Sequence, residues 1–294
     1  MPELPDIEIY REATAACVVG RRFDGVRLAS PFLLRSVEPP VADATGREVV
    51  AVERLGKRIV IALAGDLFLV LHLMIAGRLH WKPPRAPIPK RLGLAAFDFD
   101  AGTLVLTEAG TKKRASLHVV GGRAALAAFD RGGLDVLAAT AGAFATALRA
   151  ENHTLKRALT DPRLFDGIGN AYSDEILHAA RLSPLQLTRN LSDDECARLR
   201  DATRSTLVAW INRLRAEAKG AFPEKVTAFR AAMAVHGRFG QPCPACGSPV
   251  QRIVYAANEA NYCARCQTGG RLLADRAMSR LLRQDWPRSL DELA

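Results

Sequence analysis

Cys243-Pro244-Ala245-Cys246 and, after a gap of sixteen residues, Cys263-Ala264-Arg265-Cys266 form two Cys-x-x-Cys pairs. Pairs with this spacing are typical of a zinc ribbon, in which four thiolates surround one Zn²⁺ ion tetrahedrally. Because cysteine fills all four positions, no coordination site is left for water or a substrate. The sequence therefore predicts one structural zinc ion held by Cys243, Cys246, Cys263 and Cys266.

The residues between and after these pairs extend the ribbon. Residues 250–255 and 258–262 predict the two strands of a hairpin, where Arg252 and Arg265 could face phosphate. Residues 272–285 predict a basic helix, with apolar side chains on one face and arginines on the other. This tail either packs on the body of the protein or contacts DNA or a partner protein.

The chain before the ribbon has a helical pattern from about residue 135 onward. At the start of its longest helix, Ser192 and Glu195 match a capping box, in which the two side chains satisfy free amides reciprocally. His118, His153, His178 and His236 have no partner at metal-ligand spacing, so we expect surface or polar-core positions for them. The predicted helices cover residues 143–150, 155–159, 171–180, 193–217 and 224–233.

The first half of the chain predicts a helix over residues 3–18 and then short β-strands. Turn residues such as Ala64-Gly65-Asp66 separate the strands, and the proline-rich stretch 82–91 predicts a loop. Six strands at this spacing favour an antiparallel sandwich or barrel. The predicted strands cover residues 48–55, 58–63, 67–79, 94–99, 103–107 and 115–120.

Composition favours a soluble protein with a polyanionic partner. The 294 residues are 49% hydrophobic, and 41 Lys and Arg against 31 Asp and Glu give a formal charge of +10. The N-terminus lacks the basic and apolar regions of a signal peptide, and the longest apolar run, 67–76, is far shorter than the ~20 residues of a membrane span. We therefore expect a cytoplasmic protein that does not contact a membrane.

The N-terminus contains a candidate nucleophile. Removal of Met1 would leave Pro2 as a secondary amine, and the reference pKa of an α-amino group, about 7.7 to 8.0, allows a neutral fraction near pH 7. Such an amine can attack a sugar C1′ atom and form an iminium, an electron sink for base loss and β-elimination. Glu3 could move protons beside it. Taken alone, the same residues also fit an exposed chain start without a function.

Five motifs, in one order along the chain, resemble those of the formamidopyrimidine-DNA glycosylase and endonuclease VIII family. They are Met1–Glu8, Leu55–Arg58, His72–Gly77, Asp166–Glu175 and the terminal zinc ribbon. The resemblance implies an α+β multidomain chain with an antiparallel β-sandwich, a helix-two-turn-helix domain and a zinc ribbon, with DNA in the cleft between them. We expect domain boundaries at 1–130, 131–238, 239–268 and, for the tail, 269–294.

The resemblance also implies roles for single residues. Pro2 resembles the Schiff-base nucleophile, Glu3 the general acid and base, and Lys57 the lysine that contacts the phosphate beside the lesion and assists catalysis. Asn170 matches the asparagine that holds a lesion-flanking phosphate. Without the family, Asn170 would be interpreted as a helix cap and Lys57 as a solvated hairpin charge.

Enzymes that flip a nucleotide out of the helix need side chains to fill the gap. Ile75 stands where the family has its usual methionine wedge, and Met74 stands where it has glycine. Residues 108–116 replace the Asp-Pro-Arg-Arg-Phe-Gly loop of the oxoguanine enzymes. Lys112, Lys113 and Arg114 supply positive charge in this segment, but no aromatic side chain.

Three further departures concern DNA contacts and the base pocket. Arg91 stands where the family has a histidine, and it preserves a hydrogen-bond donor. Asn258 replaces the ribbon arginine that holds the lesion phosphate. Residues 218–235 are too few and too different to match the loop that caps 8-oxoguanine.

These inferences predict a base-excision repair glycosylase with abasic-site lyase activity that acts on double-stranded DNA as a monomer. We expect β- and δ-elimination after base release, and oxidised pyrimidines or formamidopyrimidines as preferred substrates over 8-oxoguanine. Two alternatives stay open. One is a lyase that acts mainly on abasic sites, and the other is a non-catalytic protein that recognises damaged DNA.

Overall fold

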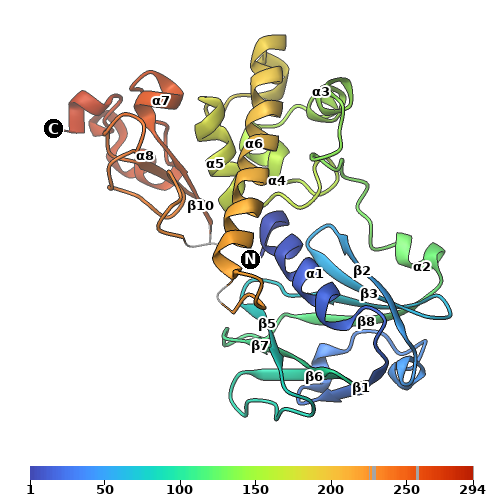
Figure 1. The fold of residues 1–294 in the computed structure, drawn as a ribbon. Helices are drawn as coiled ribbons and strands as arrows, with labels where there is room; N and C mark the ends of the chain where they lie inside the picture. The colour runs from blue at the N-terminus through green and yellow to red at the C-terminus, as the bar shows by residue number, and fades with distance from the viewer. Residues whose placement is uncertain (225, 227–229, 256–257, 294) are drawn as a thin grey trace. The chain divides into compact units, whose positions relative to one another are not determined.

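A computed structural model describes residues 1–224, 226, 230–255 and 258–293 of the chain (Figure 1). The chain divides into two compact units. The first comprises Met1–Arg131 and Trp210–Ala228, and the second comprises Gly132–Ala209 and Phe229–Ala294. Among the helices described, none is long and apolar enough to cross a membrane.

The first unit is built on two antiparallel sheets of four strands each (Figure 1). One sheet has the strand order β1-β6-β7-β5 and the other has the order β2-β3-β4-β8. The predicted antiparallel β-sandwich is therefore confirmed. The strands are β1 (Phe23–Leu28), β2 (Val49–Leu55), β3 (Arg58–Leu63), β4 (Leu67–His72), β5 (Gly77–Lys82), β6 (Gly93–Phe99), β7 (Gly102–Glu108) and β8 (Ser116–Gly121).

Strand β4 is buried on both faces, which explains its unbroken apolar sequence. Leu69 and Leu71 belong to the core that both sheets share. Phe68 and Val70 point to the opposite face and pack in a smaller cluster with Leu126 of helix α2 (Arg123–Ala127). Because successive side chains alternate between faces, a strand covered on both sides needs apolar residues at every position.

The predicted strand 67–79 is wrong in one respect, because it is two strands in two different sheets. The chain turns after His72, and the backbone N–H of Gly77 donates to the carbonyl oxygen of Leu73 at 2.9 Å. Met74 adopts a left-handed conformation with φ 53° in this turn. No glycine or proline marks the turn at that position, so the apolar pattern continues through it. Strand β1 was not predicted.

The second unit contains four main helices and the ribbon. The capping box at the start of α6 is confirmed, since the backbone N–H of Ser192 donates to Glu195 at 3.0 Å and that of Glu195 donates to the Ser192 hydroxyl at 3.2 Å. From Trp210 onward α6 belongs to the first unit. The helices are α3 (Ala141–Arg149), α4 (Leu155–Thr160), α5 (Asn170–Ala180) and α6 (Asp193–Ala218).

The predicted helix 224–233 is wrong for the part of it that is described, and residues 225 and 227–229 lie outside the described residues. Glu224 forms ion pairs with His80 (2.7 Å) and Lys82 (3.1 Å) of β5. Val226 is buried in the sandwich core, against which Phe222 also packs. These contacts within the first unit override the local helical preference.

The ribbon and the tail form one cluster in the second unit. The predicted hairpin is confirmed as β9 (Gln251–Tyr255) and β10 (Asn258–Tyr262), followed by the short helix α7 (Ala264–Thr268). In the tail, α8 (Arg276–Leu282) begins later than predicted, and Leu272 and Leu273 are buried beside Tyr262 before it starts. Leu281 is 75% exposed, so this residue of the predicted apolar face does not pack on the body of the protein.

Candidate active site and metal centre

Ile75 and Arg91 lie at the same end of the β1-β6-β7-β5 sheet. Ile75 is in the turn before β5, and Arg91 is in the loop before β6. Both strands begin opposite the last residues of β7, Thr107 and Glu108. Both side chains are exposed, and that of Ile75 is 55% exposed, as a wedge requires.

Lys57 lies at the corresponding end of the other sheet. It is in the turn between β2 and β3, next to Arg58, which pairs with His72 at the end of β4. Strand β8 also starts opposite His72. The β4–β5 turn and the 109–115 loop run from one sheet to the other at this end. The structure thus brings together the sandwich residues that the sequence predicted as site residues: Lys57, Ile75, Arg91, Lys112, Lys113 and Arg114.

Helix α1 (Leu4–Val18) positions the chain's first residues. Pro5 lies in its first turn, where a proline costs no hydrogen bond. Glu3 and Asp6 form a capping box, in which the backbone N–H of Glu3 donates to the Asp6 carboxylate at 3.0 Å and the Glu3 side chain accepts from the Asp6 backbone. Both acidic side chains are buried. Pro2, also buried, is therefore held next to a fixed carboxylate.

The surroundings of the N-terminus favour the neutral amine. Burial lowers the pKa of the α-amino group of Met1 below its ordinary value of 8.0, Glu3 opposes this shift, and the positive charges of Arg78 and Lys57 add to it. These electrostatic effects place both cations near the N-terminus. Arg78 was not predicted from the sequence. Its guanidinium donates to the carbonyl oxygen of Gly77 at 2.6 Å, which orients it beside the β4–β5 turn.

His72 is a second group whose pKa is shifted by its surroundings at this end of the sandwich. Burial lowers its pKa to about 4, and the neighbouring charges of Arg58 and Lys57 contribute to the shift. The imidazole is therefore neutral near pH 7, and the positive charge here comes from the lysine and arginine side chains.

The basic loop 109–115 is organised by Glu108, which the sequence did not reveal as a site residue. The buried Glu108 carboxylate accepts the backbone N–H groups of Arg114 (2.9 Å) and Ala115 (3.2 Å). The Lys113 ammonium donates to the carbonyl oxygen of Glu108. Lys112, Lys113 and Arg114 are all exposed, so the loop presents positive charge from a fixed backbone.

Asn170 is the first residue of α5 in the second unit. Gly169 is the N-cap, so Asn170 is not the helix cap that the residues alone suggested. Its side-chain amide donates to the carbonyl oxygen of Glu259 in β10 at 2.9 Å. This contact ties the start of α5 to the ribbon hairpin. The side chain of Asn258, the neighbouring residue in β10, lies outside the described part.

A buried polar network holds α5 to the segment before the ribbon. The Lys156 ammonium donates to the Asp174 carboxylate and to the Asn170 carbonyl oxygen, both at 2.6 Å. Asp174 also pairs with His236 Nδ1 at 2.8 Å. The Glu175 carboxylate accepts three consecutive backbone N–H groups, those of residues 234–236. His236 is a polar-core residue, as predicted.

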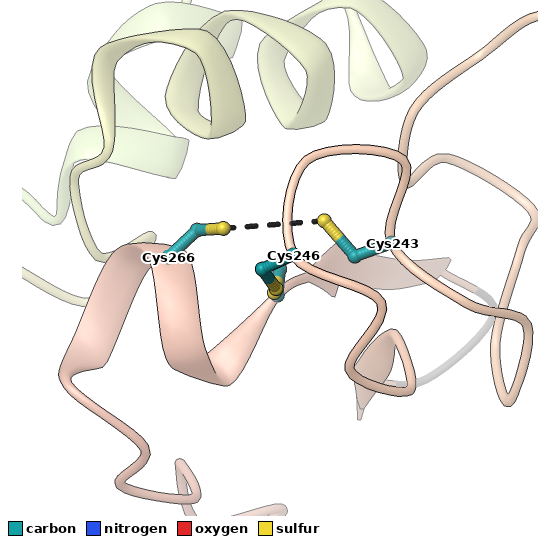
Figure 2. A group of neighbouring side chains, drawn as sticks. Cys243, Cys246 and Cys266 are labelled. Carbon is teal, nitrogen blue, oxygen red and sulfur yellow. Dashed lines mark hydrogen bonds between the residues drawn. The ribbon is translucent and has the colours of Figure 1, made fainter.

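The four cysteines of the ribbon lie close enough together to hold one metal ion, and Figure 2 labels three of them, Cys243, Cys246 and Cys266. Their sulfur atoms are all within 4.8 Å of one another. Cys243 and Cys266 Sγ are 3.9 Å apart, and Cys246 and Cys263 Sγ are 3.4 Å apart. Zn–S bonds of about 2.3 Å imply sulfur separations of about 3.8 Å. The residues therefore fit one structural zinc ion.

His178 in α5 contacts this metal site, although its sequence spacing gave no sign of it. Its Nε2 atom lies 3.2 Å from Cys243 Sγ, within the second unit. A ring N–H that donates to a metal-bound thiolate orients the ligand and offsets part of its charge. The contact links the helix that carries Asn170 to the zinc ribbon.

We expect His178→Phe to release zinc about tenfold faster than the parent chain, because loss of an outer-shell hydrogen bond costs about 10- to 100-fold in metal affinity. The measurement is zinc transfer to a chromogenic chelator at neutral pH. His153→Phe is the matched control, since His153 bonds to Glu151 and contacts no cysteine. Equal release from both variants would contradict a role for His178 at the metal.

Three family models match consecutive parts of the chain. They are the formamidopyrimidine-DNA glycosylase N-terminal domain over residues 1–115, the formamidopyrimidine-DNA glycosylase H2TH domain over 134–218, and the zinc finger found in FPG and IleRS over 240–269.

Curated relatives match along most of the chain. The formamidopyrimidine-DNA glycosylase of Thermus thermophilus is 33% identical over 281 residues, which is 92% of this chain and 100% of the relative. That of Roseiflexus sp. is 33% identical over 278 residues, covering 91% and 100%. An uncharacterized formamidopyrimidine-DNA glycosylase-like protein of Mycobacterium tuberculosis is 40% identical over 151 residues, covering 51% and 94%.

Solved structures share the fold. MutM in complex with DNA that contains carbocyclic 8-oxo-G matches with a TM-score of 0.80 at 23% identity, covering 91% of this chain and 100% of that chain. The wild-type Lactococcus lactis FPG in complex with DNA that contains an oxidized pyrimidine matches with a TM-score of 0.80 at 24% identity, with the same coverage.

Proposed function

The chain belongs to the formamidopyrimidine-DNA glycosylase family, and on that premise we propose that it is a base-excision repair DNA glycosylase with abasic-site lyase activity. It removes an oxidised or ring-opened base from double-stranded DNA and then nicks the strand. The observation that carries this proposal is the buried Pro2-Glu3 start, held by α1 near Lys57 and Arg78.

Base release begins with the neutral amine of Pro2, which forms a bond to C1′ of the damaged nucleotide. The bond between C1′ and the base breaks, and the base leaves with the electron pair and takes a proton from water. The sugar ring then opens at the C1′–O4′ bond, and Glu3 carries the amine proton to O4′. The product is a positively charged iminium between Pro2 and the open sugar.

Strand cleavage follows from the same iminium. Water takes a C2′ proton, and the 3′ phosphate leaves by β-elimination. Water then takes the C4′ proton, and the 5′ phosphate leaves by δ-elimination. Water then hydrolyses the iminium and frees Pro2. Lys57 and Arg78 bind the flanking phosphates. Their charges lower the pKa of the α-amino group of Met1, and we expect them to favour the neutral amine of Pro2 in the same way. We propose that one copy of the chain suffices and that it acts in the cytoplasm.

Lesion choice follows from the segment after α6. Phe222 and Val226 pack in or against the sandwich core. Glu224 is held by His80 and Lys82. In the described residues of this segment, which exclude 225 and 227–229, these contacts hold the chain on the sandwich and do not form a loop that closes over a bulky purine. We propose that oxidised pyrimidines and formamidopyrimidines are released faster than 8-oxoguanine.

The test is single-turnover base release by the Glu3→Gln variant on duplexes with an oxidised pyrimidine, a formamidopyrimidine or 8-oxoguanine. We expect release to slow by about 10²- to 10⁴-fold, because glutamine cannot carry a proton. Its amide oxygen can still accept the Asp6 N–H, so the start of α1 should stay folded. Glu12→Gln, an acidic residue of the same helix that pairs with Arg215, is the matched control and should keep full activity.

Each alternative has its own outcome in this assay. Nicking of abasic duplexes without base release from any lesion would identify a lyase that acts on abasic sites. Tight binding of damaged duplexes without release or nicking would identify a damage-recognition protein. Fastest release of 8-oxoguanine opposite cytosine would contradict the proposed lesion preference.

A further inference from the structure

A hollow of about 470 Å³ lies between the end of the zinc ribbon and the last residues of the tail. Its lining includes Arg265, Arg271 and Arg288, together with Ser289 and Asp291. Three arginines face one aspartate, so the hollow is positively charged. It lies wholly within the second unit, and its lining includes none of the four zinc-binding cysteines.

Backbone hydrogen bonds between ribbon and tail build this hollow. Arg271 and Ser289 form an antiparallel bridge. The N–H of Leu272 donates to the carbonyl oxygen of Arg288 at 2.8 Å, and the N–H of Leu290 donates to that of Gly270 at 3.0 Å. The arginine positions are therefore set by main-chain pairing and do not depend on flexible chain ends.

Apolar packing and the zinc site also hold these segments in place. Leu272 is buried, and Leu290 packs against its cluster. Arg265 lies in α7 between the zinc ligands Cys263 and Cys266, so metal binding restrains its backbone. The backbone at all three arginines is therefore held in place.

The guanidinium groups are available to a ligand. All three arginines are exposed, and in the described part of the chain none of them forms an ion pair. The nearby acid Glu292 is already engaged, because it accepts the Arg288 N–H at 2.8 Å and the Ser289 hydroxyl at 3.3 Å. Only Asp291 opposes their charge in the lining.

We propose that this hollow is a binding site for the DNA backbone, separate from the lesion site, in which Arg265, Arg271 and Arg288 hold phosphodiester groups. Guanidinium groups match phosphate oxygens in geometry and charge. A backbone contact carries no sequence information, so it strengthens binding to any duplex. The inference rests on the proposed function only in requiring that the chain binds DNA.

The test compares two double variants of the full-length, zinc-loaded chain on an undamaged duplex at 50 to 200 mM salt. Arg271→Gln/Arg288→Gln removes two charges from the hollow. Arg280→Gln/Arg283→Gln removes two exposed charges from the same tail outside it. We expect the first variant to lower the slope of log K against log salt by about 2, because each phosphate contact contributes about 0.9. Its affinity at low salt should fall about tenfold or more.

The control variant should keep the parent slope, and adding Arg265→Gln to the first variant should lower the slope further. Equal slopes and affinities for the two double variants would overturn the proposal, and would leave the hollow to a different ligand such as an acidic protein segment. Zinc content and circular dichroism show that each variant is folded. Covalent trapping of an abasic duplex at saturating protein should persist in both variants. A parent chain that neither binds nor traps DNA would instead contradict the proposed function.

Discussion

Replacing Pro2 by glycine is expected to lower the rate of borohydride trapping on an abasic duplex at least about a hundredfold, the lower end of what a positioned catalytic group contributes. A secondary amine gives an iminium whose positive charge is permanent. The primary amine of glycine gives an imine that must first be protonated to withdraw electrons. The measurement is the rate of covalent complex formation on denaturing gels, after mass spectrometry has shown that Met1 is absent.

Pro5→Ala is the matched control, because it removes the nearby proline in the first turn of α1 and leaves the terminal amine unchanged. It should trap DNA at nearly the parent rate. An extra serine before Pro2 turns the amine into an amide and should abolish trapping without changing any side chain. Undiminished trapping by Pro2→Gly together with this extended chain would mean that another residue forms the Schiff base.

The pH profile gives a second measure of the same amine. Only the neutral form attacks, so trapping rises with pH through the amine's pKa. Burial lowers the pKa of the α-amino group of Met1, and the charges of Arg78 and Lys57 add to this shift. We expect the same surroundings to lower the pKa of the Pro2 amine once Met1 is removed. We therefore expect the midpoint of this rise to lie below the ordinary value of 8.0 in the parent chain.

The parts of the fold that depend on local spacing could be predicted from the sequence. Two Cys-x-x-Cys pairs define a zinc ribbon wherever the chain places them, and the Ser192-to-Glu195 cap needs only one helical turn. The turn at residues 73–76 could not be predicted, because Met74 takes a left-handed conformation that usually requires glycine. Residues 222–226 could not be placed either, since burial of Val226 in the sandwich decides their structure.

The site shows the same division between local and tertiary information. Pro2, Glu3 and Lys57 could be proposed as site residues because they stand in family motifs, and their roles are still predictions. Arg78 and His178 could not be proposed from the sequence, because each lies close to a group that is distant along the chain. For Arg78 this group is the N-terminus. His178 meets Cys243 65 positions further along the chain. Charge and spacing alone cannot distinguish such a contact from a surface histidine.

Lys156→Met is expected to lower the free energy of unfolding by about 3 to 5 kcal/mol, the cost of removing the lysine from a buried carboxylate that keeps its contact with His236. Lys156 is 6% exposed, and Asp174 is completely buried. Their contact is 2.6 Å long, and the lysine also holds the Asn170 carbonyl oxygen at the start of α5. Urea denaturation followed by circular dichroism measures the loss.

A double-mutant cycle separates the ion pair from simple packing. In Lys156→Met/Asp174→Asn the buried charge is gone, and the asparagine oxygen can still accept from His236, so the double variant should be more stable than Lys156→Met alone. Arg157→Met changes the exposed neighbour in α4 and should stay within about 0.5 kcal/mol of the parent chain. If Lys156→Met were no less stable than Arg157→Met, the pair would not be what holds α5 in place.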